Sequence, residues 1–128
     1  MPLRVLVVDD NRDAADALGL LLETLGASVR VCYAGADALA LAPAFLPHAG
    51  LFDVDMPGMS GLVLSRRVRE VLPGRPVFLV AVTGIGDAAA RERTAAAGFD
   101  LHLTKPADGV ALAGRLLGFW RANFPREW

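Results

Sequence analysis

Apolar residues follow two alternating spacings along the chain, and each spacing predicts a different element. Short and nearly continuous apolar runs are typical of strands covered on both faces. Apolar positions that recur at every third and fourth residue predict helices with one buried face. The expected strands are 3–8, 28–33, 50–54, 77–83 and 99–104, and the expected helices are 12–25, 36–46, 62–72, 87–97 and 109–124. This strict alternation predicts an α/β fold, with a single parallel sheet doubly wound by helices on both faces.

Individual residues refine these elements. Asn11 or Asp10 is expected to cap the first helix, and Pro43 to kink the second helix or end it early. The run 77–83 is the most apolar strand, which favours a central place in the sheet. One face of the last helix is expected to pack on the sheet, and its members are Val110, Ala113, Leu117, Trp120 and Phe124.

Length and composition indicate one domain with a full core. The chain has 128 residues, of which 54% are hydrophobic, so we expect a single domain over 1–128 with its core at about 3–124. The net charge of -1 argues against direct nucleic-acid binding. The one cysteine, Cys32, excludes an internal disulfide and is expected to be a small buried residue. No apolar run is long enough to span a membrane and no signal peptide is evident, which predicts a cytoplasmic protein with no membrane partner.

Polar and charged residues follow the predicted strands at their carboxyl ends. In an open α/β sheet these ends share one edge, where ligands bind. The residues at this edge are Asp9 and Asp10, Asp53 and Asp55, Thr83, and Lys105. Each of them alone is most often a turn former, a strand end or a solvated charge. Their coincidence at four strand ends favours a functional site, and Lys105 is the only lysine in the chain.

The chemistry of this group of side chains favours a metal ion and a phosphoryl group. Carboxylates that lie close together repel one another, and a divalent cation relieves that repulsion. Mg²⁺ prefers oxygen ligands and keeps part of its coordination shell for water or phosphate oxygens. A phosphoryl group beside the cation would be held by Lys105 and would accept a hydrogen bond from Thr83.

Four motifs together resemble the response-regulator receiver domain of two-component and phosphorelay signalling. They are VLVVDDN at 5–11, DVDMPGMSG at 53–61, AVTG at 81–84 and TKP at 104–106. The separations of 30 residues from Asp53 to Thr83 and 52 residues from Asp53 to Lys105 are typical of that family. The resemblance covers residues 3 to about 124. It implies the flavodoxin-like strand order 2-1-3-4-5.

The resemblance implies a role for each residue of the site. Asp53 matches the phosphoacceptor. Lys105 and Thr83 match the lysine and the hydroxyl that contact the phosphoryl group, and the Lys105–Pro106 peptide bond is expected to be cis. The implied cofactor is Mg²⁺, or Mn²⁺ in its place. Its expected ligands are the carboxylates of Asp10 and Asp53, the backbone carbonyl of Asp55, and Asp9 through water.

The resemblance also implies a switch and its partners. Thr83 matches a hydroxyl that moves on activation, and His102 stands where the family usually has an aromatic switch residue. Asp55 and Ile85 match positions that tune dephosphorylation. The face made by helix 87–97, strand 99–104 and helix 109–124 is expected to change shape, and two copies could pair through it. The implied partners are a histidine kinase or histidine phosphotransfer protein and a downstream effector or fused output domain.

Three other interpretations fit parts of the sequence. The segment 84–89 has the GxGxxA spacing of a dinucleotide-binding turn, but it lies in the fourth strand–helix unit rather than the first. Asp53 and Asp55 resemble the DxD of haloacid-dehalogenase-type phosphatases, although no cap domain fits in 128 residues. A receiver used as a binding module without phosphorylation is the strongest alternative. We expect a protein that catalyses its own modification and is not a conventional turnover enzyme.

Overall fold

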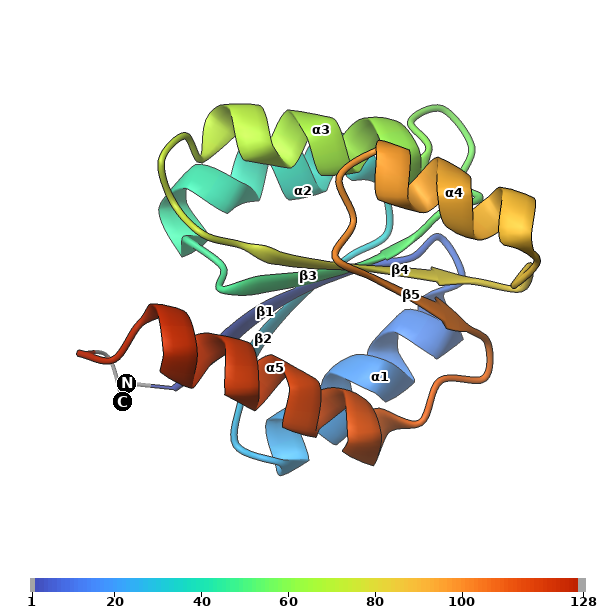
Figure 1. Cartoon of the computed structure of the whole chain (residues 1–128). Coiled ribbons are helices and arrows are strands. Elements are labelled where there is room, and N and C mark those ends of the chain that lie inside the picture. Colours follow the sequence, from blue (N-terminus) through green and yellow to red (C-terminus); the bar gives the residue numbers. More distant parts are fainter. Residues whose placement is uncertain (1, 127–128) are drawn as a thin grey trace.

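The computed structural model describes residues 2–126 and alternates strand and helix five times (Figure 1). Residues 1, 127 and 128 of the predicted domain lie outside the described part. The strands are β1 (Arg4–Val8), β2 (Ser28–Cys32), β3 (Ala49–Asp53), β4 (Phe78–Thr83) and β5 (Leu101–Thr104). The helices are α1 (Arg12–Thr24), α2 (Gly35–Phe45), α3 (Gly61–Val71), α4 (Ala88–Ala96) and α5 (Gly109–Asn123). All the predicted elements are present, and their ends differ by at most 2 residues from those expected.

The five strands form one parallel sheet in the order β2-β1-β3-β4-β5, which confirms the predicted order. Val8 of β1 pairs with Cys32 of β2 and with Phe52 of β3. Asp53 pairs with Val82, so the end of β3 lies beside the end of β4. The central strand is β3 and not β4, because β5 follows β4 and forms the edge of the sheet. Strand β4 is nevertheless interior and almost wholly buried.

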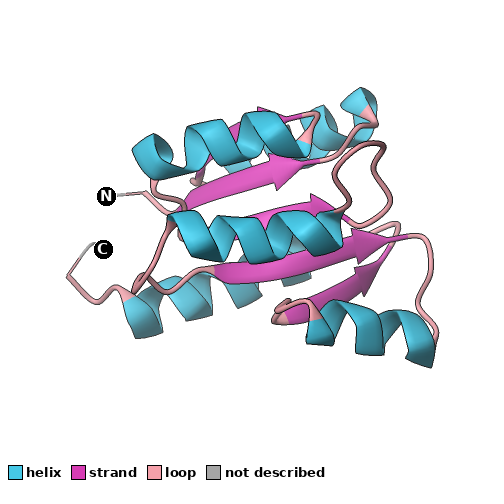
Figure 2. Cartoon of the chain, turned by 90° about the horizontal axis from the view of Figure 1, so that it is seen from above, coloured by secondary structure: helices cyan, strands magenta, loops and turns pink. Residues whose placement is uncertain are grey.

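Helices cover both faces of the sheet, so neighbouring residues of each strand enter different cores (Figures 1 and 2). Helices α2, α3 and α4 lie on one face and α1 and α5 on the other. In β1, Leu6 and Val8 belong to the first core, whereas Val5 and Val7 belong to the second. Burial on both faces explains why the strands are nearly continuous apolar runs in the sequence.

Polar side chains cap the helices that start at the functional edge of the sheet. Asn11, and not Asp10, caps α1, because its side chain accepts a hydrogen bond from the backbone of Ala14. Ser60 and Asp108 cap α3 and α5 in the same way. These caps satisfy backbone donors that have no partner within the helix. Asp10 is therefore left for another role.

Two local expectations need correction. Helix α2 runs through Pro43 and ends two residues later, at Phe45. Proline in the last turn removes a hydrogen bond only near the end of the helix, where the loss is small. Helix α5 packs on the sheet through most of the expected face, because Trp120 is buried and Ala113, Leu117 and Phe124 lie partly buried against the core. Val110 is 70% exposed, however, and the buried face extends instead to Gly109, Leu112 and Leu116.

His48 lies at the amino ends of the strands, opposite the carboxyl ends that carry the predicted site, and the sequence analysis gave it no role. His48 is fully buried, and its Nδ1 accepts a hydrogen bond from the backbone N–H of Arg4 at 2.8 Å. Its ring packs against Phe124 with centroids 4.6 Å apart. His48 thus joins the start of β1 to the end of α5. Among residues 2–126, no helix combines the length and the apolar character needed to cross a membrane.

Candidate functional site

The sheet brings together charged residues that are far apart in the sequence. Asp9 follows β1, Asp53 ends β3 and Lys105 follows β5. Lys105 Nζ lies 3.1 Å from Asp9 Oδ2 and 3.5 Å from Asp53 Oδ1. Asp9 and Asp53 are buried, whereas the Lys105 side chain is about one third exposed. One cation therefore contacts two buried carboxylates at the expected edge of the sheet.

The surroundings of Asp53 oppose its ionisation. Burial raises the pKa of Asp53 most, and the negative charge of Asp9 raises it further. The charge of Lys105 and the backbone N–H of Asp55 act in the other direction, and the resulting pKa is about 6, compared with an ordinary value of 3.8. A cation bound beside Asp53 would favour the carboxylate, which is the form that acts as a nucleophile.

Lys105 remains charged between these two carboxylates. Burial lowers the pKa of Lys105, but the hydrogen bond to Asp9 and the charge of Asp53 outweigh burial and raise the pKa above 10.5. The backbone N–H of Lys105 donates to the carbonyl of Thr83 at 2.8 Å. The Lys105–Pro106 peptide bond is cis. The ammonium group is thus held over the site by the backbone of the neighbouring strand.

Asp10 completes a cluster of carboxylates. One oxygen from each of Asp9, Asp10 and Asp53 lies within 4.8 Å of the others. Asp9 and Asp53 are buried and Asp10 is exposed, so the cluster is open on one side. Three carboxylates against one ammonium leave an excess of negative charge. A set of oxygen ligands with excess negative charge fits Mg²⁺.

The backbone around Asp53 is held in place by close contacts. The carboxylate Oδ1 of Asp53 accepts a hydrogen bond from the backbone N–H of Asp55 at 3.4 Å. The N–H of Gly61 donates to the carbonyl of Val54 at 3.0 Å. A Cβ atom on Gly61 would lie 2.3 Å from the carbonyl oxygen of Asp53, which only a glycine avoids. The start of α3 therefore approaches the end of β3 more closely than any other residue would allow.

Thr83 and Asp55 face each other beside the carboxylate cluster. The Thr83 hydroxyl donates to Asp55 Oδ2 at 3.4 Å and accepts from the backbone N–H of Ile85 at 3.3 Å. Thr83 is buried, whereas Asp55 and Ile85 are exposed. These three residues and His102 help to line a cavity of about 20 Å³. A polar cavity of this volume has room for one water molecule.

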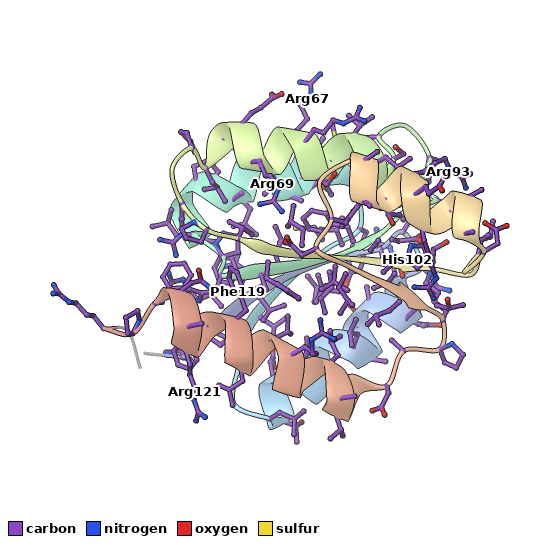
Figure 3. The ribbon with its side chains drawn as sticks, in the orientation of Figure 1. Arg67, Arg69, Arg93, His102, Phe119 and Arg121 are labelled. Atoms are coloured by element: carbon purple, nitrogen blue, oxygen red, sulfur yellow. The ribbon has the colours of Figure 1, made fainter. Side chains whose placement is uncertain are left out.

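His102 lies inside the molecule, beneath α4 and near Arg93 in Figure 3. Its Nε2 is 3.0 Å from the carbonyl oxygen of Ile85, and its Nδ1 is 2.9 Å from the hydroxyl of Thr94. A carbonyl only accepts hydrogen bonds, so Nε2 carries the proton. The ring therefore joins β5 to the loop after β4 and to α4. The switch role that the resemblance implies for His102 would have the ring turn inward on phosphorylation, whereas the ring already points inward here.

Sequence reasoning missed the partners of these side chains. It did not identify Thr94, which anchors His102, or the contact between Thr83 and Asp55. Thr94 has the spacing of a buried helix residue, but the strand residue that it meets depends on how α4 crosses the sheet. The remaining predicted site residues lie at the expected edge, with Asp10, Asp55 and Ile85 on its exposed side.

Comparisons with known proteins agree with this geometry. Residues 5–116 match the sequence profile of the response regulator receiver domain. A protein of 14.6 kDa from Leptolyngbya boryana is 38% identical over 123 residues, which cover 96% of this chain and 93% of that protein. Response regulator MprA of Mycobacterium sp. strain KMS is 33% identical over 99% of this chain. The matched region is 54% of MprA, so the chain spans about half the length of that relative.

Solved structures show the same fold. The BeF3-activated receiver domain of DrrB, a Thermotoga maritima protein, superimposes with a TM-score of 0.83 at 28% identity and covers 94% of this chain and 99% of that domain. A CheY-like receiver domain protein from Methanospirillum hungatei has a TM-score of 0.85 at 24% identity, and the match covers 96% of this chain and 97% of that one. The matched profile covers most of the chain and includes every residue of the carboxylate cluster. The chain therefore belongs to the response regulator receiver domain family, whose members are signalling modules rather than conventional enzymes.

Proposed function

We propose that Asp53 accepts a phosphoryl group from a phosphohistidine of a histidine kinase or histidine phosphotransfer protein. The observation that carries this proposal is the contact of one ammonium group, Lys105, with two buried carboxylates, Asp9 and Asp53. Structural carboxylates at a strand end would not need to be buried against one another. The arrangement instead prepares a nucleophile beside a fixed positive charge.

The transfer exchanges one bond to phosphorus for another. An oxygen of the Asp53 carboxylate attacks phosphorus, and the P–N bond to the donor histidine breaks. The imidazole ring, protonated at its other nitrogen, keeps the electron pair of that bond and leaves as a neutral ring. Lys105 offsets the negative charge that gathers on the phosphoryl oxygens, and the Thr83 hydroxyl donates a hydrogen bond to one of them.

Receiver domains bind Mg²⁺ at an acidic pocket, and the carboxylate cluster of this chain fits that ion. We assign Asp10 and Asp53 as direct ligands through their side chains and Asp55 through its backbone carbonyl. Asp9 would act through water, because its carboxylate is already bonded to Lys105 and to the backbone N–H of Asn11. When bound, Mg²⁺, or Mn²⁺ in its place, supplies positive charge that offsets the charge of the carboxylates and of the phosphoryl group.

Phosphorylation is proposed to act on the loop after β4 through Thr83 and His102. The phosphoryl group would draw the Thr83 hydroxyl away from Asp55. The inward ring of His102 would then hold the loop and α4 in the new arrangement through Ile85 and Thr94. The phosphoryl group needs only to favour one of two existing states. The α4–β5–α5 face would present that state to an effector, an output domain or a second copy of the chain.

The lifetime of the phosphorylated state is proposed to depend on Asp55 and Ile85. Both lie on the exposed side of the site, where water would reach a phosphoryl group on Asp53. The side chain of Ile85 is 49% exposed and forms no hydrogen bond through its hydrocarbon atoms, so it hinders water without orienting it. The Asp55 carboxylate, by contrast, is polar and accepts a hydrogen bond from Thr83.

Labelling of Asp53 tests the proposed function. Incubation with phosphoramidate and Mg²⁺ should add one phosphoryl group that is stable in acid and labile in base. Asp53→Asn should remove the label. Asp37→Asn, which changes an exposed carboxylate of α2, should keep it. A label that persists in Asp53→Asn would overturn the assignment and favour a binding module without phosphorylation at this residue.

A further inference from the structure

Arg93 of α4 borders the small cavity beside the carboxylate cluster, and the proposed function gives it no role (Figure 3). The cavity, of about 20 Å³, is lined by Asp55, Thr83 and Ile85 as well as by Arg93. Arg93 is the only arginine or lysine among the residues that line it. Within residues 2–126, no carboxylate forms an ion pair with Arg93. A positive charge with room for a partner therefore lies at the same cavity as a carboxylate.

Asp55 is the carboxylate at this cavity, and phosphorylation would remove its partner. Its Oδ2 accepts a hydrogen bond from the Thr83 hydroxyl at 3.4 Å, and its backbone N–H donates to Asp53 Oδ1 at 3.4 Å. A phosphoryl group on Asp53 would draw the Thr83 hydroxyl away and bring further negative charge close to the Asp55 carboxylate. That carboxylate would then lack a donor beside a group of the same charge, which costs free energy.

We propose that Arg93 is a positioning residue of the phosphorylated state, and that its guanidinium group forms an ion pair with Asp55 when Thr83 leaves that carboxylate. The inference rests on the proposed function. It adds the positive charge that offsets Asp55 and a second link between α4 and the site. The first link is the hydrogen bond between His102 and Thr94, at 2.9 Å.

The place of Arg93 on α4 allows this contact. Arg93 is three residues after Ala90 and four before Ala97, which are both buried, so its side chain starts close to the inner side of the helix. Arg93 is itself exposed, so its guanidinium group can turn without disturbing the core. Arginine can donate two parallel hydrogen bonds to one carboxylate. The neighbouring Arg91 is already engaged, because its Nε donates to the carbonyl of Gly86 at 3.1 Å.

The ion pair and the phosphoryl group would favour each other. Phosphorylation frees the Asp55 carboxylate for Arg93, and Arg93 in turn offsets the charge that opposes phosphorylation. Because such a coupling is reciprocal, loss of Arg93 should lower the affinity of the site for a phosphoryl mimic. The same ion pair would hold α4 to the loop after β3 in the phosphorylated state.

Titration with beryllofluoride at saturating Mg²⁺ tests the inference, because this ion stands in for the phosphoryl group on Asp53. The bound ion is measured by fluorine NMR. Arg93→Gln should weaken its affinity about threefold, as expected for a partly exposed ion pair. Arg93→Lys keeps the charge and should recover most of the loss. Arg67→Gln is the matched control, because Arg67 is an exposed arginine of α3, and it should leave the affinity unchanged (Figure 3).

Asp55→Asn shows whether Arg93 acts through this carboxylate. The substitution removes the charge and keeps the backbone carbonyl that is proposed to bind the metal. In the Asp55→Asn background, Arg93→Gln should leave the affinity for beryllofluoride unchanged. The Nε–H signal of Arg93 in NMR spectra should shift when beryllofluoride binds to the unmodified protein, and it should shift much less in Asp55→Asn.

The outcomes distinguish this inference from the proposed function. An affinity that Arg93→Gln leaves unchanged would overturn the inference and leave Asp53 as the acceptor. A loss of affinity that is equally large in the Asp55→Asn background would mean that Arg93 does not act through Asp55, which also overturns the inference. Absence of beryllofluoride binding to the unmodified protein, together with absence of labelling by phosphoramidate, would overturn the proposed function itself.

Discussion

Replacing Asp53 by asparagine should stabilise the protein in the absence of metal. Burial and the charge of Asp9 raise the pKa of Asp53 from 3.8 to about 6, so the folded state holds the proton more tightly than the unfolded state does. Below pH 4 Asp53 is protonated in both the folded and the unfolded state, so its burial does not lower the free energy of unfolding. As pH rises from about 4 to 6, the unfolded state ionises first, and the free energy of unfolding falls. Above pH 6 the full penalty is present.

The size of the penalty follows from the difference in pKa. A rise from 3.8 to about 6 corresponds to about 3 kcal/mol, at about 1.4 kcal/mol for each pH unit. Asparagine removes the charge and keeps the shape of the side chain, and Lys105 keeps its partner Asp9. Residual structure in the unfolded chain reduces the difference in the pKa of Asp53 between the two states, and with it the free energy. We expect the free energy of unfolding of Asp53→Asn at pH 7.5 to exceed that of the unmodified protein by between about 1 and 3 kcal/mol.

Urea unfolding in EDTA at pH 4.5, 5.5, 6.5 and 7.5 measures this gain. The difference between Asp53→Asn and the unmodified protein should be small at pH 4.5 and reach a plateau near pH 7. Asp37→Asn, on an exposed part of α2, should show a small difference that does not vary with pH. Mg²⁺ should stabilise the unmodified protein and reduce the gain, because it binds the folded state. A loss of stability in Asp53→Asn at pH 7.5, or a gain independent of pH, would refute the reasoning.

Three further predictions concern the metal, the lifetime of the phosphoryl group and the switch. Calorimetric titration with Mg²⁺ should show a loss of affinity of about tenfold or more in Asp10→Ala and a smaller loss in Asp9→Ala, and the reverse order would exchange their assignments. Ile85→Ala should speed loss of the phosphoryl group about threefold, because water gains access, and an unchanged decay rate would place Ile85 away from the path of the water. The ring signals of His102 in NMR spectra should change when beryllofluoride and Mg²⁺ are added, and identical signals would make His102 a packing residue only.

The fold could be predicted from the sequence because each strand ends in a clear change of pattern. The same change located the site, since Asp9, Asp53, Thr83 and Lys105 each lie at a strand end. The centre of the buried face of α5 could not be predicted in this way. Its sequence, GVALAGRLLGFWRAN, has apolar residues on more than one side, so spacing alone does not show that Leu116 is buried more deeply than Leu117.

Contacts between elements were also beyond the sequence pattern. The position of His102 in the sequence relative to Lys105 predicted a switch role. Its hydrogen bond with Thr94, however, depends on how α4 lies over β5. His48 is surrounded by parts of β1 and α5 that are distant in the chain. Hydrophobic spacing describes which side of an element is buried. It does not describe which side chains meet across the core.

The close approach of Gly61 to Asp53 gives the two sides of the site different stiffness. On one side, the start of α3 touches the end of β3 through main-chain atoms, which leaves little freedom for either to bend. On the other side, α4 is tied to β5 through the hydroxyl of Thr94 and the imidazole of His102, which turn about single bonds. A displacement of Asp53 would therefore move α4 more easily than α3. If phosphorylation of Asp53 acts as proposed, the contrast between a main-chain contact and a side-chain contact would direct the change toward α4 rather than α3.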